Sequence, residues 1–149
     1  MKNELVETKS EFWWQRETVR FECLKCGGCC GGEPGTIWVT AAEISQIAEF
    51  IGEDETKLRE NYLTRRDGRS SIKDLENYDC VFLRRSEGRC AIYSVRPLQC
   101  RLFPFWPSIL RDKNIWNYYA FRCPGMDKGK IYTSEMIQSL KNYNIWQDL

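Results

Sequence analysis

The stretch Cys23-Leu24-Lys25-Cys26-Gly27-Gly28-Cys29-Cys30 holds half of the cysteines of this chain. Two-residue spacers let consecutive thiolates turn toward one ion or cluster, while backbone amides hydrogen-bond the sulfurs. Five of the ten glycines lie between residues 27 and 35, and glycine reaches backbone conformations that are closed to other residues. The stretch therefore predicts a chain that bends tightly around a metal.

The composition narrows the chemistry further, because the 149 residues include eight cysteines and no histidine. Without imidazole, His/Cys zinc fingers, histidine-ligated iron or haem, and Ser-His-Asp or Cys-His catalysis are excluded. Lys and Arg number 22 against 21 Asp and Glu, so there is no basic excess of the kind that nucleic-acid binding usually needs. We expect no nucleic-acid partner.

The termini and apolar runs bear on location. Residues 1–10 lack the apolar segment of a secretory signal, and no apolar run approaches the ~18 residues of a membrane span. We therefore expect a cytoplasmic protein without a membrane span. In that compartment thiols stay reduced, and clustered cysteines ligate metal more often than they form disulfides.

Three cysteines at this pitch also open the cysteine run of bacterial ferredoxins, in which a remote Cys-Pro supplies a further ligand. Cys123-Pro124 fits that description. The match is incomplete, because Cys30 follows Cys29 directly where a ferredoxin run has a three-residue spacer.

The adjacent pair Cys29 and Cys30 indicates more than one site. Their Cα atoms are about 3.8 Å apart, and successive side chains of extended backbone diverge, so we expect the pair to divide between two sites. Three cysteines of the run with one remote cysteine, and Cys30 with three remote ones, make two four-thiolate sites. The predicted metal ligands are all eight cysteines: Cys23, Cys26, Cys29, Cys30, Cys80, Cys90, Cys100 and Cys123.

The metal identity is left between two chemistries, since all-thiolate sites suit both iron–sulfur clusters and zinc. Structural zinc favours two CxxC pairs per site, whereas a cluster favours a triplet with a remote cysteine. The spacing therefore favours an iron–sulfur cluster, 4Fe-4S in type, with zinc as the alternative. Simple burial of the cysteines as small hydrophobes would not explain CxxCxxCC among glycines.

Arginines directly adjoin three of the remote cysteines: Arg89, Arg101 and Arg122. A cation beside a thiol lowers the thiol pKa and offsets the negative charge of a four-thiolate site. We predict that these arginines support the cofactor electrostatically. The alternative is that they are ordinary residues at the edges of strands.

The predicted elements give an α+β fold in one small domain, with short strands and two to four helices around the metal. Thr40 and Glu43 form a capping box for a helix over residues 40–51, and a second helix is predicted from Asp54 to about Leu63. Residues 12–21 fit strand or helix equally well. We predict a hairpin over 80–93, an irregular loop over 96–107, a strand over 115–121 and a C-terminal helix over 133–147.

The predicted hairpin also implies which residues of its two strands lie opposite each other. A turn centred near Glu87 places Cys90 opposite Leu83 and Cys80 opposite Tyr93. The two thiols then lie on opposite faces, so they would serve different sites, or one of them would be unused.

Several motifs in fixed order resemble the YkgJ-type CxxCxxCC cysteine-cluster family, over residues 21–125. These motifs are the run at 21–30, Cys80-Val81-Phe82-Leu83, and Cys90-Ala91-Ile92-Tyr93-Ser94-Val95-Arg96-Pro97-Leu98-Gln99-Cys100-Arg101-Leu102-Phe103-Pro104-Phe105. The resemblance implies zinc or iron chelation by the eight cysteines. Family relatives include stand-alone proteins and a domain of flagellin lysine methylases. The chain also resembles one relative in particular, the small cysteine-rich subunit of the methanogens' deazaflavin-oxidising dehydrogenase.

Together these observations predict an iron–sulfur protein that transfers electrons or serves as an accessory subunit of a larger redox complex. The single domain spans residues 1–149, and a protein partner is expected. The alternative is a zinc-stabilised interaction module without redox activity. No acid–base or nucleophilic constellation is evident in the sequence, so we name no catalytic residue.

Overall fold

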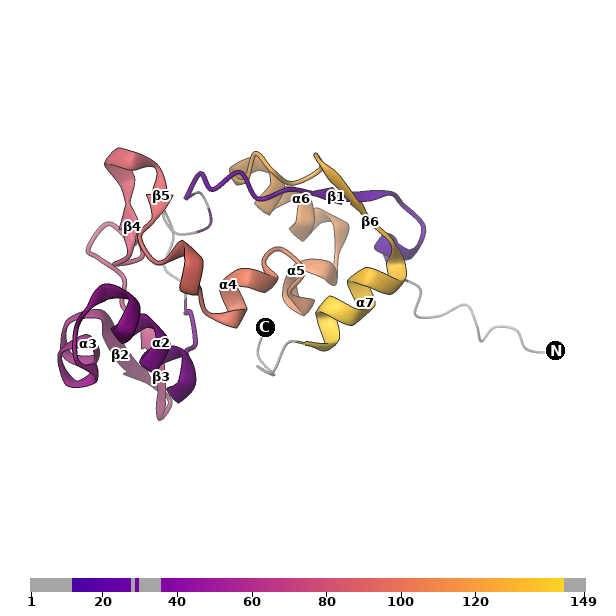
Figure 1. Cartoon of the computed structure of the whole chain (residues 1–149). Coiled ribbons are helices and arrows are strands. Elements are labelled where there is room, and N and C mark those ends of the chain that lie inside the picture. The colour runs from indigo at the N-terminus through magenta and orange to yellow at the C-terminus, as the bar shows by residue number, and fades with distance from the viewer. Residues whose placement is uncertain (1–11, 28, 30–35, 144–149) are drawn as a thin grey trace. The chain divides into compact units, whose positions relative to one another are not determined.

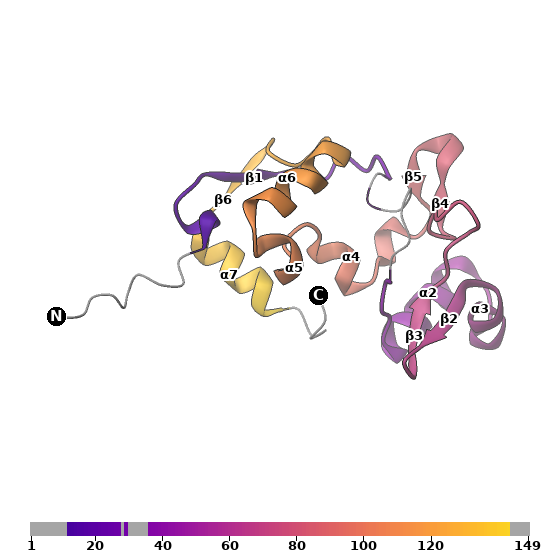
Figure 2. The same cartoon turned by 180° about the vertical axis from the view of Figure 1, so that it is seen from behind.

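The computed structural model describes residues 12–27, 29 and 36–143, which fall into two compact units. The central unit is Leu24–Phe103, and the terminal unit consists of the described parts of Met1–Cys23 and Pro104–Leu149. Figures 1 and 2 show both units from opposite sides. Helices mix with short antiparallel strand pairs, which confirms the predicted α+β class. That the two units act as one domain over residues 1–149 stays a prediction.

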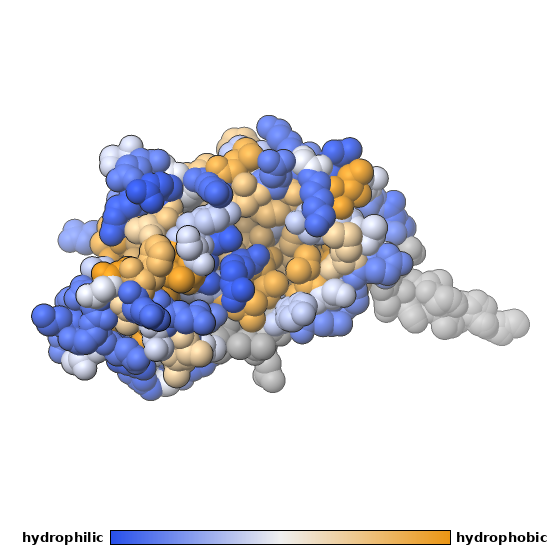
Figure 3. Space-filling model, viewed as in Figure 1, coloured by the Kyte–Doolittle hydropathy of each residue, from blue (hydrophilic) through white to orange (hydrophobic). Residues whose placement is uncertain are grey.

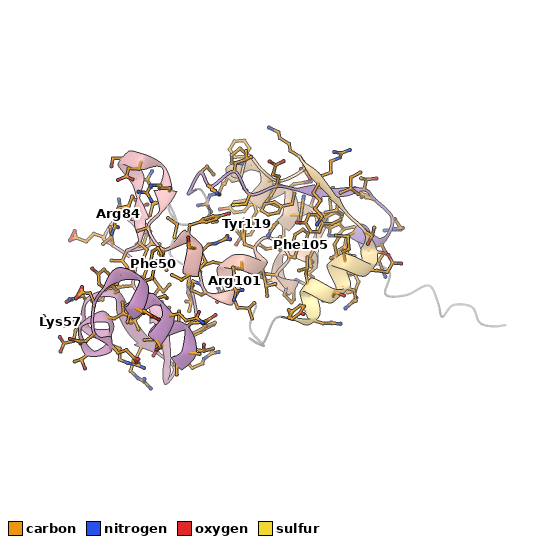
Figure 4. All side chains as sticks on the ribbon, in the orientation of Figure 1. Phe50, Lys57, Arg84, Arg101, Phe105 and Tyr119 are labelled. Carbon is orange, nitrogen blue, oxygen red and sulfur yellow. The ribbon has the colours of Figure 1, made fainter. Side chains whose placement is uncertain are left out.

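The central unit is built on two helices, α2 (Ala41–Ile51) and α3 (Glu55–Tyr62). The Thr40 side chain caps α2 in the predicted capping box, and Gly52 ends this helix in a left-handed conformation. Asp54 caps α3 by accepting a hydrogen bond from the Lys57 N–H. Figure 3 shows a mostly hydrophilic surface around α3, and in Figure 4 Lys57 points away from the helix.

Two strands join these helices in one core. β2 (Leu63–Arg66) pairs antiparallel with β3 (Arg69–Ile72) through a turn at Asp67 and Gly68, which both have positive φ. Asp-Gly with two positive φ angles is the preferred two-residue hairpin connection. The buried residues of this core are Val39, Ile44, Ile47, Ala48, Leu58, Leu63, Ile72, Phe82 and Ile92.

The outer edge of β3 is occupied by the segment at residues 37–39. The Val39 N–H donates to the Ser70 carbonyl at 3.1 Å, and the Ile72 N–H donates to the Ile37 carbonyl at 2.9 Å. The segment that follows residues 23–35, which we term the cysteine–glycine stretch, is therefore held as a third, short strand-like piece.

The remaining elements of the central unit are very short. β4 (Leu83–Arg84) and β5 (Arg89–Cys90) flank η3 (Arg85–Glu87), and η4 (Tyr93–Val95) precedes α4 (Leu98–Leu102). Gly88 ends the hairpin turn with a φ of 64°. Elements of two to five residues have little stability of their own, so contacts with the rest of the unit must fix them.

The terminal unit packs aromatic side chains between helices and one strand pair. η1 (Trp13–Gln15) leads into β1 (Val19–Phe21), which pairs with β6 (Lys130–Tyr132). α5 (Pro107–Leu110), α6 (Lys113–Arg122) and α7 (Ser134–Asn142) complete the unit. The indole N–H of Trp13 donates to the Leu110 carbonyl at 2.9 Å, and both Trp13 and Trp14 are buried.

Three helices, α2, α3 and α7, match their sequence predictions. α2 and α3 begin and end within a residue of the predicted bounds, and α7 starts directly after its Thr133 cap. The predicted end of the last helix, at residues 144–147, lies outside the described residues.

Two predicted elements are wrong. Residues 115–121 form the body of α6 rather than a strand, because Asp112 caps the helix by accepting from the Asn114 N–H. Residues 96–107 are not an irregular loop, since they contain α4 and the start of α5, with Pro97 and Pro107 at helix N-termini. Proline is tolerated there because the first N–H groups of a helix have no partner within it.

No helix in the described part of the chain is long and apolar enough to cross a membrane.

We predict different costs for two glycine substitutions. Gly129 and Gly68 both have positive φ, at 80° and 76°. A Cβ at Gly129 would overlap the Glu22 side chain, whereas nothing lies within 4 Å of a Cβ at Gly68. Gly68→Ala should lower the free energy of unfolding by about 1–2 kcal/mol from the left-handed backbone alone, and Gly129→Ala by more. Thermal unfolding of both variants checks this, and equal losses would contradict the overlap.

Candidate metal centre

The described cysteines divide between the two units. Cys26, Cys29, Cys80, Cys90 and Cys100 belong to the central unit. Cys23 and Cys123 belong to the terminal unit. Cys30 lies outside the described residues.

The β4–β5 hairpin positions two of the thiols. Leu83 pairs with Cys90, which confirms that part of the predicted register. Cys80 does not pair with Tyr93, which is already in η4; instead it forms a bridge with Asp74. The hairpin is therefore shorter than predicted, because the chain leaves the ladder after Cys90 and turns, with the Val95 N–H bonded to the Ile92 carbonyl.

Asp79 fixes the start of this hairpin. The Asp79 side chain is buried and accepts hydrogen bonds from both nitrogens of the Arg85 guanidinium edge, one of them at 2.7 Å. The same carboxylate accepts from Asn77 at 3.3 Å. This ion pair ties the residue before Cys80 to the turn of the hairpin, so the acidic group has a structural role.

The CxxC segment lies against the same hairpin. A Cβ on Gly27 would come within 2.7 Å of Leu83 Cδ1, and Gly27 has a φ of 79°. Only glycine fits here, both because of its backbone conformation and because of this close approach. Since Leu83 pairs with Cys90, Gly27 brings the Cys26–Cys29 region beside the strand that carries Cys90.

The thiols of the central unit are electrostatic neighbours. The pKa of Cys80 is raised to about 12, chiefly by burial and to a smaller extent by the nearby Cys90, Asp74 and Cys29, while an N–H of Phe82 hydrogen-bonded to the sulfur opposes the rise. The pKa of Cys100 is also raised well above its ordinary value, first by burial and then by Cys29, Cys80 and Cys90. Cys29, Cys80, Cys90 and Cys100 therefore form one neighbourhood, which we term the central thiol group.

The alternation of side chains along a strand predicts that Cys80 and Cys90 serve different sites, and this neighbourhood does not agree with that prediction. The alternation applies along a continuous ladder, and Cys80 stands outside the two-residue β4. Cys90 nevertheless raises the pKa of Cys80, so the two thiols are neighbours.

The central thiol group is not closed into a coordination shell. Among the residues that the structure describes, no three Cys, Asp or Glu side chains converge as a metal site. The donors nevertheless fit a thiophilic metal, because four neighbouring thiols with no histidine anywhere in the chain suit zinc or iron–sulfur ligation.

In the terminal unit, backbone pairing connects the neighbourhoods of Cys23 and Cys123. The Glu22 N–H donates to the Gly125 carbonyl at 3.0 Å, and Phe21 forms a bridge with Met126. Cys123 is buried and Cys23 is exposed.

The adjoining arginines have other contacts. Arg89 pairs with Glu87 at 2.6 Å, and Arg101, on α4 in Figure 4, donates from Nε to the Arg96 carbonyl at 3.2 Å. The cation that lowers the pKa of Cys100 is Arg96, whose guanidinium also stacks 3.8 Å from the Tyr93 ring centroid. Sequence adjacency could not find Arg96, because the chain turns between residues 96 and 100.

A family comparison agrees with this cysteine chemistry. The model of the CxxCxxCC family, described as a "putative zinc- or iron-chelating domain", matches residues 22–139. The chain belongs to this family. The predicted family resemblance is thereby confirmed, and its matched part extends through most of α7.

A relative in Methanocaldococcus jannaschii is an uncharacterized protein, 29% identical over 119 residues, with 76% of this chain and 63% of the relative covered. The chain thus spans under two thirds of the length of that relative. No solved structure matches the chain. The link to the small subunit of the deazaflavin-oxidising dehydrogenase stays a prediction.

We predict that the metal-free chain shows uneven thiol reactivity. A pKa of about 12 instead of 9.0 leaves Cys80 about a thousandfold less thiolate at pH 8, and the thiolate is the reactive form. Iodoacetamide should therefore modify the exposed Cys23, Cys26 and Cys29 well before Cys80 and Cys100, as mass spectrometry of timed samples would show. In guanidinium chloride all cysteines should react alike. Equal rates in the folded chain would contradict the grouping.

Proposed function

We propose that this protein is an iron–sulfur protein that transfers electrons or serves as an accessory subunit of a larger complex. The observation that carries the proposal is the central thiol group, in which Cys29, Cys80, Cys90 and Cys100 are neighbours in a chain without histidine. A bound cluster would supply one-electron transfer.

All eight cysteines are the proposed ligands, as the sequence predicts. The neighbourhood in the central unit supports one set made of Cys29, Cys80, Cys90 and Cys100. This set uses Cys29 where the sequence argument used Cys30. Cys30 is kept apart from Cys29, as in the sequence argument, and Cys23, Cys26, Cys30 and Cys123 stay proposed ligands.

The backbone around Cys26 favours a cluster over a single ion. The sign of φ alternates, with 58° at Lys25 and 79° at Gly27 on either side of Cys26. Alternating signs turn successive backbone N–H groups toward one side, and such nests of N–H groups hold phosphates and iron–sulfur clusters. The N–H of Phe82 adds a hydrogen bond to the Cys80 sulfur.

Cations near the thiols would offset the negative charge of a four-thiolate site. We retain Arg89, Arg101 and Arg122 in this role and add Arg96, whose effect on the Cys100 pKa supports it most directly. A partner is supported by Phe121 on α6, an aromatic side chain that is 93% exposed.

The second candidate is a zinc-stabilised interaction module. It is favoured by the open arrangement of the central thiol group, because a site that its metal organises is incomplete before the metal binds. In that case binding energy is folding energy, and the metal has no redox role.

We predict that protein purified without oxygen is brown and contains iron and acid-labile sulfide. Its visible charge-transfer absorption should bleach on reduction with dithionite. Cys90→Ser should remove at least half of the iron, since it takes a thiolate from the central set. Ser86→Ala, an exposed change in the same hairpin, should retain it.

Elemental analysis for iron and zinc separates the two candidates. A colourless chain with stoichiometric zinc, which unfolds when a chelator removes the metal and gives no redox signal, would establish the zinc module. A wild-type chain that holds neither metal would contradict both.

A further inference from the structure

The helix that carries Cys100 is attached to the rest of the central unit by two polar side chains. α4 (Leu98–Leu102) has five residues, and no side chain within it caps its N-terminus. A helix this short is not stable in isolation. What holds α4 therefore also sets where the Cys100 thiol lies.

Gln99 makes the first attachment. Its side chain is 1% exposed; its Oε1 accepts from the Trp38 N–H at 2.9 Å and its Nε2 donates to the Thr36 carbonyl at 2.7 Å. A carboxamide has the same donor and acceptor as a peptide group. Since residues 37 and 39 bond to β3 on one edge, Gln99 takes the place of a neighbouring strand on the other.

Glu43 makes the second attachment, from α2. Its Oε1 accepts from the Thr40 N–H at 2.9 Å, which is half of the capping box. Its Oε2 accepts from the Leu98 N–H at 2.6 Å. One carboxylate therefore caps α2 and satisfies the first N–H of α4, and a carboxylate at a helix N-terminus is also favoured by the helix dipole.

The two attachments close a ring. Thr36 and the residues after it are bonded to Gln99 of α4. The first N–H of α4, at Leu98, is bonded to Glu43. Glu43 in turn caps α2, the helix that directly follows the Thr36 segment. Thr36 is the first described residue after Cys29 in the cysteine–glycine stretch. The ring thus joins the chain leaving that stretch to the helix with the Cys100 thiol.

We infer that Gln99 and Glu43 are positioning residues, which hold the Cys100 helix against the chain leaving the cysteine–glycine stretch and so determine how tightly the central thiol group holds its metal. This inference rests on the proposed metal-binding function. It concerns residues that bear no metal ligand atom themselves. Residues that orient ligands in this way typically contribute about 10–100-fold to metal affinity.

Three variants of the full chain test the inference. Gln99→Met keeps the side-chain volume but neither hydrogen bond, and Glu43→Gln keeps only one of the two acceptors. Asp54→Ala is the matched control, because it removes a helix cap in the same unit, from α3, which bears no cysteine. Each is titrated with Zn²⁺ alone against a chromophoric chelator, and thermal unfolding and hydrogen exchange are followed in the metal-free chain.

Gln99→Met should lower the Zn²⁺ affinity by about tenfold or more and speed exchange of the Trp38 amide, and Glu43→Gln should lower the affinity less. Asp54→Ala should lower the melting temperature while leaving the affinity unchanged. Wild-type affinity in Gln99→Met overturns the inference. So does an equal affinity loss in Asp54→Ala at an equal loss of stability, because the effect would then be general destabilisation.

Two further outcomes have distinct meanings. If Gln99→Met does not fold, the milder Glu43→Gln decides, and wild-type affinity there overturns the inference. If the wild-type chain takes up no Zn²⁺ and no iron, the proposed function fails, and the positioning role fails with it. If the wild-type chain binds metal and Gln99→Met binds it with the same affinity, only the positioning role is overturned and the proposed function stands.

Discussion

Four neighbouring thiols cannot all be charged in a part-buried place without a cation among them, and the central unit is organised around this constraint. Burial and repulsion by neighbouring thiols raise the pKa of Cys80 and Cys100, so these two thiols are neutral in the metal-free chain. A metal reverses the balance because it binds thiolates and releases their protons. The same burial that makes Cys80 and Cys100 unreactive in the metal-free chain also lowers the local dielectric around these two thiols.

The elements that carry these thiols are too short to hold themselves in place. β4 and β5 have two residues each and α4 has five, whereas α2 has eleven and builds much of the core. The long elements are stabilised by core packing, and polar side chains fix the short elements through hydrogen bonds. Asp79 with Arg85 does so for the hairpin, and Glu43 with Gln99 does so for α4. Short segments that are fixed from outside leave the thiols that they carry free of strict helix or strand geometry.

The sequence was sufficient where local chemistry decides the structure. Helix ends were predicted from side-chain oxygens that cap the N-terminus and from a glycine that takes a left-handed conformation at the C-terminus. The structure has these ends at Thr40 with Glu43, at Asp54, at Thr133 and at Gly52. Sequence reasoning failed at residues 115–121, which we predicted as a strand because they are rich in β-formers, whereas Asp112 caps a helix there and Trp116 is buried. The β2–β3 hairpin was missed despite its Asp67-Gly68 turn, because its arginines and serines hide the usual apolar alternation. Gln99 gives no sequence signal, since its partners lie some sixty residues earlier.

Neighbours in sequence and neighbours in space differ most clearly for the arginines. Arg89 directly precedes Cys90 in the sequence, and its side chain pairs with Glu87 in the exposed turn. Arg96 precedes Cys100 by one turn of chain, stacks on Tyr93, and accepts a hydrogen bond from Arg101 at its carbonyl. Its guanidinium thereby lies near the Cys100 thiol and opposes the rise in the pKa of that thiol.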